Sequence, residues 1–344
     1  ENYSETKRIH KNPTLMPNID RGLAPDLKIF DKRHFIRPMA GKMYNMATVV
    51  WTRGCVFHCS YCANETFYKA YNVKAKEYYR KKDVKMLVEE LQRIKEEHKI
   101  NFFMFVDDIW PMHDIELTRE FSELYKKYVR LPFSVNLQVK LIKEEAFGIA
   151  VDGGLRNVSI GVESGSFKIR KDILQRNYKN EDVTRAFGLA HKHKIRSSSF
   201  NIMGLPHETR EDIMDTIELN RLAQPDSATV TFFHPYRGAP LRKLCIEEGL
   251  IKAGDAKHED LYRNESQLTM PQITKQELKN LMAAFQLYFK LPKEYWPLIR
   301  ESEDQTSDKA KKIREDILLP AFREVEAQAM KYDFTKWENW YSKP

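Results

Sequence analysis

The chain has 344 residues, of which 42% are hydrophobic, so it can form one large domain or two ordinary ones with a substantial core. Its mean hydropathy of -0.60 and the lack of any run near the roughly 20 apolar residues that span a bilayer argue against a membrane protein. Three of its four cysteines are clustered, which favours a reducing cytoplasm. The net charge of +8 allows an anionic substrate or a nucleic acid, but lysines spread over helix faces explain it more simply.

The N-terminal residues 1–47 contain four prolines and show little periodicity. They are therefore expected to form a linker or an arm that packs over the rest of the chain. Residues 1–30 lack the apolar centre of a secretion signal. The chain begins with Glu1 rather than methionine, which suggests a processed chain or a fragment of a longer one.

A cysteine motif follows the first predicted strand, residues 48–52. Cys55, Cys59 and Cys62 occur within eight residues with the spacing C-x3-C-x2-C, so their thiolates can converge on one metal centre. Iron–sulfur clusters are held by cysteines in short spacings of this kind. A four-iron cluster bound by only three cysteines leaves one iron open to another ligand.

Zinc is the main alternative for these cysteines. A structural zinc site needs four protein ligands. His58 is the nearest candidate, but it directly precedes Cys59 and adjacent side chains diverge, while Cys245 is remote. A disulfide framework fits poorly with a clustered, odd number of cysteines. The spacing therefore favours a cluster over zinc or inert thiols.

Six strands alternate with helices between residues 48 and 249. The strands are expected at 48–52, 101–106, 132–138, 157–162, 195–203 and 227–233, and the helices at 83–98, 114–129, 141–151, 180–194 and 210–223. Continuous apolar runs such as 101–106 are typical of parallel strands covered on both faces. Right-handed crossovers then curl the sheet into a partial (β/α)6 barrel of the TIM type, an α/β fold with a wide lateral opening.

The pattern changes in residues 250–344, which are expected to form a helical cap that determines substrate specificity. An amphipathic helix is predicted at 274–290 and a long charged helix at 306–331. Three further features are expected there: a kink at Pro320, a loop over the barrel mouth at 252–266, and a tail anchored by Trp337 and Trp340.

Polar side chains follow two of the predicted strands, at the edge where such barrels keep their chemistry. Asp107 and Asp108 follow the second strand, and Glu163 and Ser164 follow the fourth. A carboxylate and a hydroxyl in this position can bind sugar hydroxyls. The alternative is that the two aspartates cap the adjacent loop and helix and that the serine caps a helix.

The cysteine motif, with Tyr61 before its last cysteine, resembles the signature of the radical S-adenosylmethionine (radical SAM) superfamily. In that family three cysteines hold a 4Fe-4S cluster whose open iron is chelated by the amino and carboxylate groups of SAM. Electron transfer from the reduced cluster then cleaves the sulfonium and yields a deoxyadenosyl radical. The resemblance implies that Cys55, Cys59 and Cys62 are the metal ligands and that 4Fe-4S and SAM are the cofactors.

Three later segments also resemble this superfamily. Residues 161–165 resemble the Gly-x-Glu-Ser-Gly segment of the subgroup that contains cobalamin-dependent enzymes and methylthiotransferases. Residues 204–209 look like the Gly-Leu-Pro-x-Glu-Thr turn, whose preceding strand passes the adenine. Residues 234–241 resemble the Pro-Tyr-Pro-Gly-Thr-Pro turn, with Arg237 and Ala239 in place of proline and threonine, departures that affect loop rigidity more than chemistry.

The resemblance also implies which side chains contact SAM. These are Asp107 or Asp108 at the amino group, Glu163 and Ser164 at the ribose, Arg176 at the carboxylate, Met203 or Ile202 and Tyr236 at the adenine, and Tyr61 within the motif. An arginine at a helix end is more often solvated or paired with carbonyls, which is the alternative for Arg176. Core packing is the simpler interpretation for Met203 and Ile202.

The expected reaction is methyl transfer to, or rearrangement at, an unactivated carbon, with the catalytic residues unassigned. Residues 19–31 resemble the connector that joins a cobalamin domain to the barrel in cobalamin-dependent radical SAM enzymes. The chain has no Asp-x-His-x-x-Gly cobalamin-ligand motif, so a cobalamin domain is expected upstream, if the chain is a fragment, or on a separate chain. The alternative is that the chain is complete, in which case it performs a different radical reaction without cobalamin. The other expected partners are a small-molecule or peptide substrate and an electron donor such as flavodoxin or ferredoxin, with neither a membrane nor a nucleic acid.

Three other functions compete with this interpretation. A tRNA-modifying methylthiotransferase is the nearest, but no second cysteine set or terminal RNA-binding domain is visible in the sequence. A non-catalytic zinc-binding module would use the same cysteines. A nucleic-acid-binding protein would use the basic surface and bind with a strong salt dependence.

Overall fold

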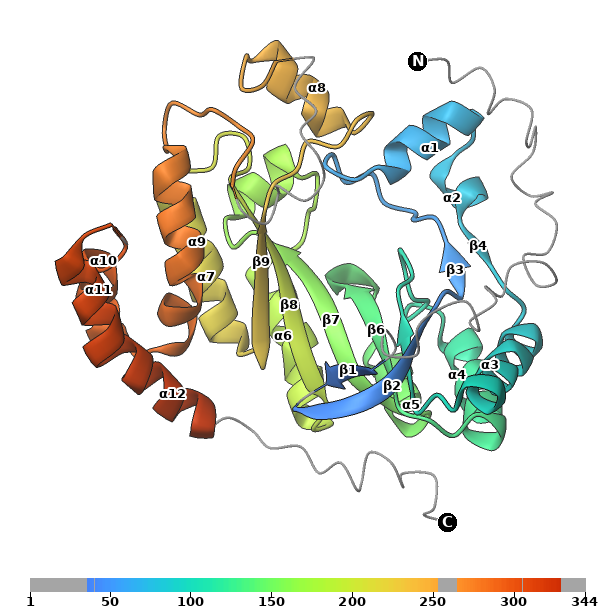
Figure 1. Ribbon diagram of the computed structural model, residues 1–344. Helices are drawn as coiled ribbons and strands as arrows, with labels where there is room; N and C mark the ends of the chain where they lie inside the picture. Colours follow the sequence, from blue (N-terminus) through green and yellow to red (C-terminus); the bar gives the residue numbers. More distant parts are fainter. Residues whose placement is uncertain (1–35, 40, 253–264, 305, 329–344) are drawn as a thin grey trace.

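A curled sheet forms the centre of the molecule (Figure 1). The computed structural model describes residues 36–39, 41–252, 265–304 and 306–328. Seven strands lie in the order β1 (Ile36–Met39), β2 (Lys42–Val49), β5 (Phe102–Phe105), β6 (Phe133–Gln138), β7 (Leu155–Glu163), β8 (Arg196–Met203) and β9 (Ser227–Phe232). Six of them are parallel, and β1 pairs antiparallel with β2. The predicted α/β partial barrel with six parallel strands is therefore confirmed.

Helices cover the outside of the curl (Figure 1). They are α3 (Val84–His98), α4 (Ile115–Tyr128), α5 (Glu144–Asp152), α6 (Asn180–Lys192) and α7 (Arg210–Ala223), followed by α8 (Pro240–Glu247) beyond β9. Three of them begin at side chains that accept backbone N–H groups of the first turn, namely Asp83, Asp114 and Thr209. Because these caps satisfy donors that a helix start leaves free, helix starts were predictable to within a few residues.

The main core lies between the sheet and helices α3 to α6. At one end, Phe105 and Phe133 of adjacent strands pack with Phe121 of α4, with ring centroids 5.6 to 5.8 Å apart. Trp51 stacks on Phe121 at 4.8 Å. Because Trp51 directly precedes the segment that leads into the cysteines, this aromatic cluster anchors the base of the cysteine loop to the barrel wall.

The N-terminal part of the barrel differs from the expectation. Residues 36–39 and 42–47 were assigned to a linker, but they lie in the antiparallel pair β1–β2, which has Gly41 before its second strand with a φ of +87°. A second difference follows the cysteines, where the sequence predicted no regular structure. There α1 (Asn64–Tyr71) and α2 (Ala75–Tyr78) lie between the short paired strands β3 (Thr52–Arg53) and β4 (Arg80–Lys81). All four elements are too short to show a hydrophobic period in the sequence.

The C-terminal helices lie against α7 on one side of the barrel (Figure 1). The helix predicted at 274–290 is α9 (Lys275–Lys290), and α10 (Trp296–Glu301) follows it. The single helix predicted at 306–331 is divided into α11 (Asp308–Ile313), a π-helical turn (Arg314–Leu318) and α12 (Leu319–Gln328). The wider turn directly precedes Pro320, which has no N–H to continue the α-helical pattern. Residues 253–264, Trp337 and Trp340 lie outside the described residues.

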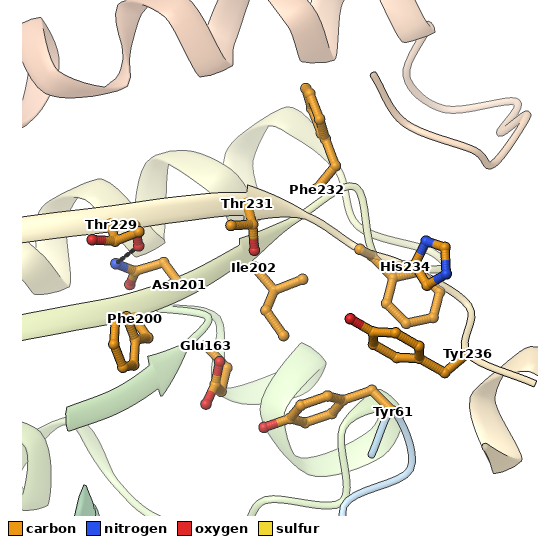
Figure 2. Close-up of a pocket in the computed structure, with 11 residues that line it drawn as sticks. Tyr61, Glu163, Phe200, Asn201, Ile202, Thr229, Thr231, Phe232, His234 and Tyr236 are labelled. Atoms are coloured by element: carbon orange, nitrogen blue, oxygen red, sulfur yellow. Dashed lines mark hydrogen bonds between the residues drawn. The ribbon is translucent and has the colours of Figure 1, made fainter. Parts of the chain in front are cut away.

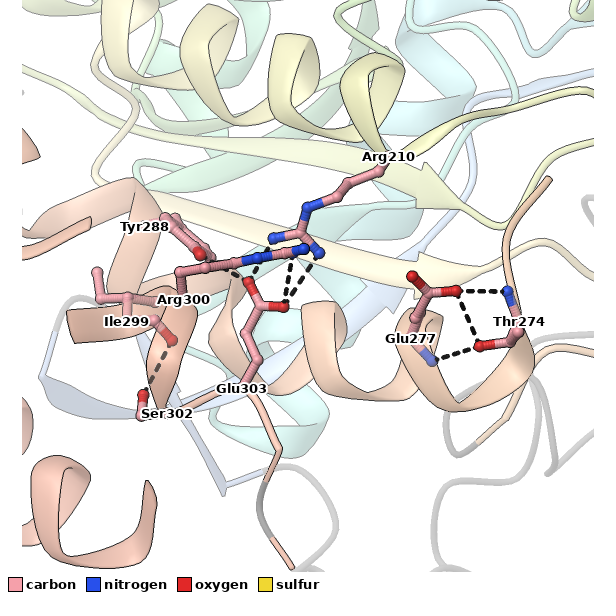
Figure 3. A network of polar contacts seen from close by, with 8 residues as sticks. All are labelled: Arg210, Thr274, Glu277, Tyr288, Ile299, Arg300, Ser302 and Glu303. Atoms are coloured by element: carbon pink, nitrogen blue, oxygen red, sulfur yellow. Dashed lines mark hydrogen bonds and ion pairs between the residues drawn. The ribbon is translucent and has the colours of Figure 1, made fainter. Parts of the chain in front are cut away.

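A buried carboxylate joins these helices to the barrel (Figure 3). Glu303 accepts hydrogen bonds from Arg210 of α7 at 2.5 and 3.0 Å, from Arg300 at 3.2 Å and from the Tyr288 hydroxyl of α9 at 2.6 Å. This charge is well compensated, so it fixes the orientation of the helices without leaving an unpaired ion. Among the described residues, no helix combines the length and apolar character needed to cross a bilayer.

Candidate functional site

The three clustered cysteines lie on the loop between β3 and α1, and all are half-buried free thiols. Burial raises the pKa of the Cys55 thiol to about 12, and negative charge on Cys59 and Cys62 acts in the same direction. Three thiolates that repel one another inside the protein need a positive centre between them to be stable. The donor set therefore fits a metal centre bound by sulfur.

The arrangement fits a cluster better than a single ion. No three His, Cys, Asp or Glu side chains in the described part of the chain are grouped to hold one metal ion. In a cubane cluster each thiolate binds a different iron, so its ligands lie further apart than those of one zinc ion. The two residues that zinc would need are also engaged elsewhere. His58 contacts Glu65, with Nδ1 and Oε2 2.8 Å apart, and Cys245 lies on the buried face of α8, in the core.

Two aspartates at the end of β5 hold the backbone that leads into the cysteine loop. Asp107 Oδ1 accepts the backbone N–H of Trp51 at 2.9 Å and that of Thr52. Asp108 Oδ2 accepts the N–H of Gly54 at 2.9 Å. Burial raises the pKa of Asp107 to about 6, and its Oδ2 atom has no hydrogen-bond partner among the described residues. Both carboxylates position the loop, and a contact to SAM remains a prediction.

A buried ion pair joins the cysteine loop to the sheet. The Arg176 guanidinium donates to the Tyr61 hydroxyl at 2.9 Å, to Glu163 Oε1 at 3.2 Å and to the carbonyl oxygen of Gly161 at 3.1 Å. Its charge also lowers the pKa of the Cys59 thiol, against the effect of burial. Arg176 is therefore buried and paired, not solvated. Its bond to the Gly161 carbonyl oxygen agrees with the alternative that it pairs with carbonyls, and its bonds to Tyr61 and Glu163 go beyond that alternative.

The backbone at the end of β7 is shaped to hold this carboxylate. Glu163 lies beside a register irregularity in the sheet and has a φ of +62°, in the left-handed region that residues other than glycine rarely adopt. A Cβ atom on Gly161 would lie 2.4 Å from Glu163 Oε1. The Gly-x-Glu segment thus needs its glycine so that the carboxylate can fold back toward Arg176. Strained backbone of this kind concentrates at functional sites.

A cavity of about 350 Å³ lies between the cysteine loop and the ends of β8 and β9 (Figure 2). It is lined by Tyr61, Glu163, Phe200, Asn201, Ile202, Thr229, Thr231, Phe232, Phe233, His234 and Tyr236. Four residues named in the sequence analysis meet here, and Figure 2 shows Tyr61, Glu163 and Tyr236 grouped around the fourth, Ile202. The site therefore joins segments that are up to 175 positions apart in the chain, from Tyr61 to Tyr236.

Five residues predicted to contact SAM are not among those that line the cavity. Asp107, Asp108 and Arg176 hold the cysteine loop as described above, and the other two are Met203 and Ser164. Met203 is buried in the core beneath α7 and α9, whereas its neighbour Ile202 faces the cavity, because successive side chains of a strand point to opposite faces. The Ser164 hydroxyl accepts the N–H of Ser166 at 3.3 Å and lies 3.5 Å from the Thr216 hydroxyl, inside the turn. Contacts of either residue to SAM remain predictions.

Several cavity residues were not predicted from the sequence. They are Phe200 and Asn201 of β8, Thr229 and Thr231 of β9, and His234, whose Nδ1 lies 2.8 Å from Gln267 Nε2. The available signal was the alternation of β9, where Thr229 and Thr231 share one face. Polar residues at every second position of an interior strand indicate a face that meets a ligand or solvent rather than core.

The curled sheet, with a cysteine loop and a cavity at the carboxyl ends of its strands, defines an α/β partial-barrel protein with a metal-cluster site. Residues 49–219, about half of the chain, match the Radical SAM superfamily. The chain belongs to the radical SAM superfamily, whose members use a 4Fe-4S cluster and SAM.

Relatives with assigned activities are distant and longer. The chain is 26% identical over 234 residues to the anaerobic magnesium-protoporphyrin IX monomethyl ester cyclase of Rubrivivax gelatinosus, covering 67% of this chain and 40% of the cyclase. It is 23% identical over 246 residues to the cytidylyl-2-hydroxyethylphosphonate methyltransferase of Streptomyces wedmorensis, covering 69% of this chain and 42% of that enzyme. The chain thus spans about two fifths of each relative.

A solved structure supports the fold. The radical SAM methyltransferase TsrM of Kitasatospora setae, solved with cobalamin and a 4Fe-4S cluster, superimposes with a TM-score of 0.53. The match covers 83% of this chain and 62% of TsrM at 14% sequence identity. The likeness extends beyond residues 49–219, so the shared architecture includes more than the barrel segment that defines the superfamily.

Proposed function

We propose that this chain is the catalytic part of a cobalamin-dependent radical SAM enzyme that transfers a methyl group to an unactivated carbon or rearranges its bonds. The observation that carries the proposal is the cavity bounded by Tyr61 of the cysteine loop and by Glu163 and Tyr236. It places polar and aromatic side chains directly beside the expected cluster. Distant methyltransferase and cyclase relatives, and a TsrM structure that contains cobalamin, support the reaction class.

The residues have distinct proposed roles. Cys55, Cys59 and Cys62 would hold the cluster, and the bound cluster and SAM would supply one-electron chemistry that protein side chains cannot perform. Arg176 would face the carboxylate of SAM, and Glu163 would bind its ribose hydroxyls. Both are already oriented by their mutual ion pair, so little reorganisation is needed on binding.

The remaining cavity side chains would orient the nucleoside and exclude water. Tyr236 and Ile202 offer an aromatic and an aliphatic surface to the adenine. Thr229 and Thr231 offer hydroxyls on the strand that borders the opening. Proximity and exclusion of water matter here because a reactive carbon centre attacks any nearby bond, so one substrate hydrogen must be held close.

The proposed partners follow from this chemistry. They are a small-molecule or peptide substrate, an electron-donor protein, and a cobalamin domain on the same or another chain. The connector-like residues 19–31 lie outside the described residues, so the cobalamin part rests on the subgroup motifs and the relatives. It is the part of the proposal that an experiment should address first.

The test is anaerobic reconstitution with iron and sulfide, followed by incubation with SAM and dithionite, with and without cobalamin. We expect about four irons per chain, a brown absorbance, and production of deoxyadenosine and methionine. Cobalamin-dependent methyl transfer would add S-adenosylhomocysteine, which a simple radical SAM enzyme does not produce. One zinc per chain and no SAM cleavage would overturn the whole proposal. Cleavage with no response to cobalamin would overturn only its cobalamin part.

A further inference from the structure

The segment from β3 to β4 concentrates the positive charge of the chain. Residues 52–82 contain seven Lys or Arg and two Glu, a net charge of +5, compared with +8 for all 344 residues. Lys74 and Lys76 of this segment are exposed and form no ion pair within the described part of the chain. Lys69, Lys81 and Lys82 are paired with carboxylates, so Arg53, Lys74 and Lys76 are the exposed basic residues that this segment presents beside the cysteine loop.

Exposed aromatic rings lie among these charges. Phe67 and Tyr71 of α1 are 45% and 36% exposed. Both stack on Tyr78 of α2, with ring centroids 6.1 and 5.7 Å apart and planes within 27° of parallel. The Arg80 guanidinium lies 4.9 Å from the Tyr78 ring. Two exposed rings that stack on a third, half-buried ring form an apolar patch of the kind that marks interaction sites.

We call this surface the basic aromatic face; it consists of Arg53, Phe67, Tyr71, Lys74, Lys76 and Tyr78. A single aromatic ring, that of Tyr78, separates this face from the cysteine loop. A Cβ atom on Gly54 would lie 2.7 Å from Tyr78 Cδ1, so the ring packs on the residue before Cys55. Tyr68 contacts Tyr78 at 5.4 Å and donates its hydroxyl hydrogen to the Cys55 carbonyl oxygen. In Figure 1, α1 and α2 project beside this loop, away from α9 to α12.

We propose that the basic aromatic face docks an acidic electron-donor protein of the flavodoxin kind. This inference rests on the proposed function, because a cluster in the cysteine loop must receive an electron from outside. The donor would lose one electron and the cluster would gain it, with no bond formed or broken. Exposed lysines would steer an acidic partner, and the stacked rings would supply the apolar centre of the interface.

The experiment uses the full chain with reconstituted cluster and a purified acidic flavodoxin as the probe. One variant carries Lys74→Glu and Lys76→Glu, a second carries Phe67→Ser and Tyr71→Ser, and all four positions are exposed. The matched control carries Lys279→Glu and Lys312→Glu, exposed lysines of α9 and of α11 on the far side of the molecule. Flavodoxin affinity and the rate of cluster reduction by reduced flavodoxin are measured for each protein.

We expect both face variants to weaken flavodoxin binding and to slow reduction by on the order of tenfold, with the control unchanged. The wild-type rate should also fall as salt rises from roughly 0.1 to 1 M. Reduction by dithionite, a small reductant that needs no docking, should be the same in all proteins. Equal rates of cluster reduction by flavodoxin in the wild type and the face variants would overturn the inference. So would face variants that bind flavodoxin normally but lose binding to an RNA oligonucleotide. Failure of dithionite to support SAM cleavage would instead count against the proposed function.

Discussion

Arg176 donates a hydrogen bond to the hydroxyl of Tyr61 at 2.9 Å, although the two residues are 115 positions apart. Tyr61 lies beside Cys62 in the cysteine loop, and Arg176 also binds Glu163 at the end of β7. One guanidinium thus fixes the cysteine loop to the sheet strand that carries the predicted ribose-binding carboxylate. The predicted cluster ligands and the predicted SAM ligand Glu163 therefore depend on the same buried charge.

The first prediction concerns this ion pair. Arg176→Met leaves the Glu163 carboxylate buried without its counter-charge, so we expect the free energy of unfolding to fall by about 3–5 kcal/mol. Adding Glu163→Gln should recover part of that loss, because the unpaired charge is then removed. Urea unfolding of both single variants and the double variant measures the coupling. Arg119→Met, which breaks an exposed pair with Glu145, should cost at most about 1 kcal/mol.

Strictly additive losses in the two single variants would contradict this account. They would mean that Arg176 and Glu163 act independently, despite a separation of 3.2 Å between their charged atoms. Equal losses for Arg176→Met and Arg119→Met would contradict it in another way, since burial would then have no effect on the cost.

The second prediction concerns the cysteines. Replacing Cys55, Cys59 or Cys62 singly by alanine should reduce iron bound after reconstitution to background and abolish the brown absorbance. Cys245→Ala is the matched control, because this thiol is buried in the core and away from the loop. It should retain full iron and lose only about 1 kcal/mol of stability. Full iron content in the Cys59→Ala protein would contradict the assignment.

The third prediction compares two glycines. A Cβ atom on Gly165 would lie 2.1 Å from the Asp215 carbonyl oxygen and 2.4 Å from the Thr216 nitrogen, both backbone atoms of α7. Gly165→Ala should therefore destabilise the protein by about 3 kcal/mol or more, or prevent folding. Gly188 of α6 faces open space, so Gly188→Ala should stabilise by about 0.5–1 kcal/mol. Thermal unfolding measures both, and similar stabilities would show that α7 can move away.

The fourth prediction concerns pH. Glu208 is fully buried, and its Oε2 accepts the N–H groups of Gly204 and Leu205 at 2.5 and 3.1 Å. Burial outweighs these bonds and raises its pKa from 4.5 to about 8. The folded protein therefore retains a proton that the unfolded chain releases above pH 4.5. The stabilisation of the folded state that comes with this retained proton is present at low pH and is lost as the pH rises through the folded-state pKa of about 8.

Glu208→Gln keeps an acceptor for both N–H groups and carries no charge, so it should remove this pH dependence. Between about pH 6 and about pH 9 we expect the wild type to lose at least about 1 kcal/mol more stability than the variant. Urea unfolding at both pH values measures the difference. Glu277→Gln is the control, because the helix cap lowers the pKa of Glu277 below its usual value. The same slope in wild type and Glu208→Gln would refute the assignment.

Local sequence patterns were enough to predict much of the fold. The helices from α3 to α7 repeat apolar residues at helical spacing, and α3, α4 and α7 begin at capping side chains, so their positions could be predicted before any tertiary contact was known. The strand predicted at 48–52 is divided between the end of β2 and β3. The strand residues before Thr48 and the short elements α1, α2 and β4 were missed because such short segments carry little periodic signal. The division of the last helix was missed because Pro320 predicts a break but not its geometry.

The three predicted sulfur ligands could be read from the chain alone, since cysteines within eight residues are neighbours whatever the fold. The same holds for the order of the main strands and helices, because apolar periodicity is a local property. The folded structure was needed to show that Ile202 rather than Met203 faces the cavity and that Arg176 reaches Tyr61. Those outcomes depend on the register between strands and on sheet curvature, which arise from contacts between residues far apart in the chain.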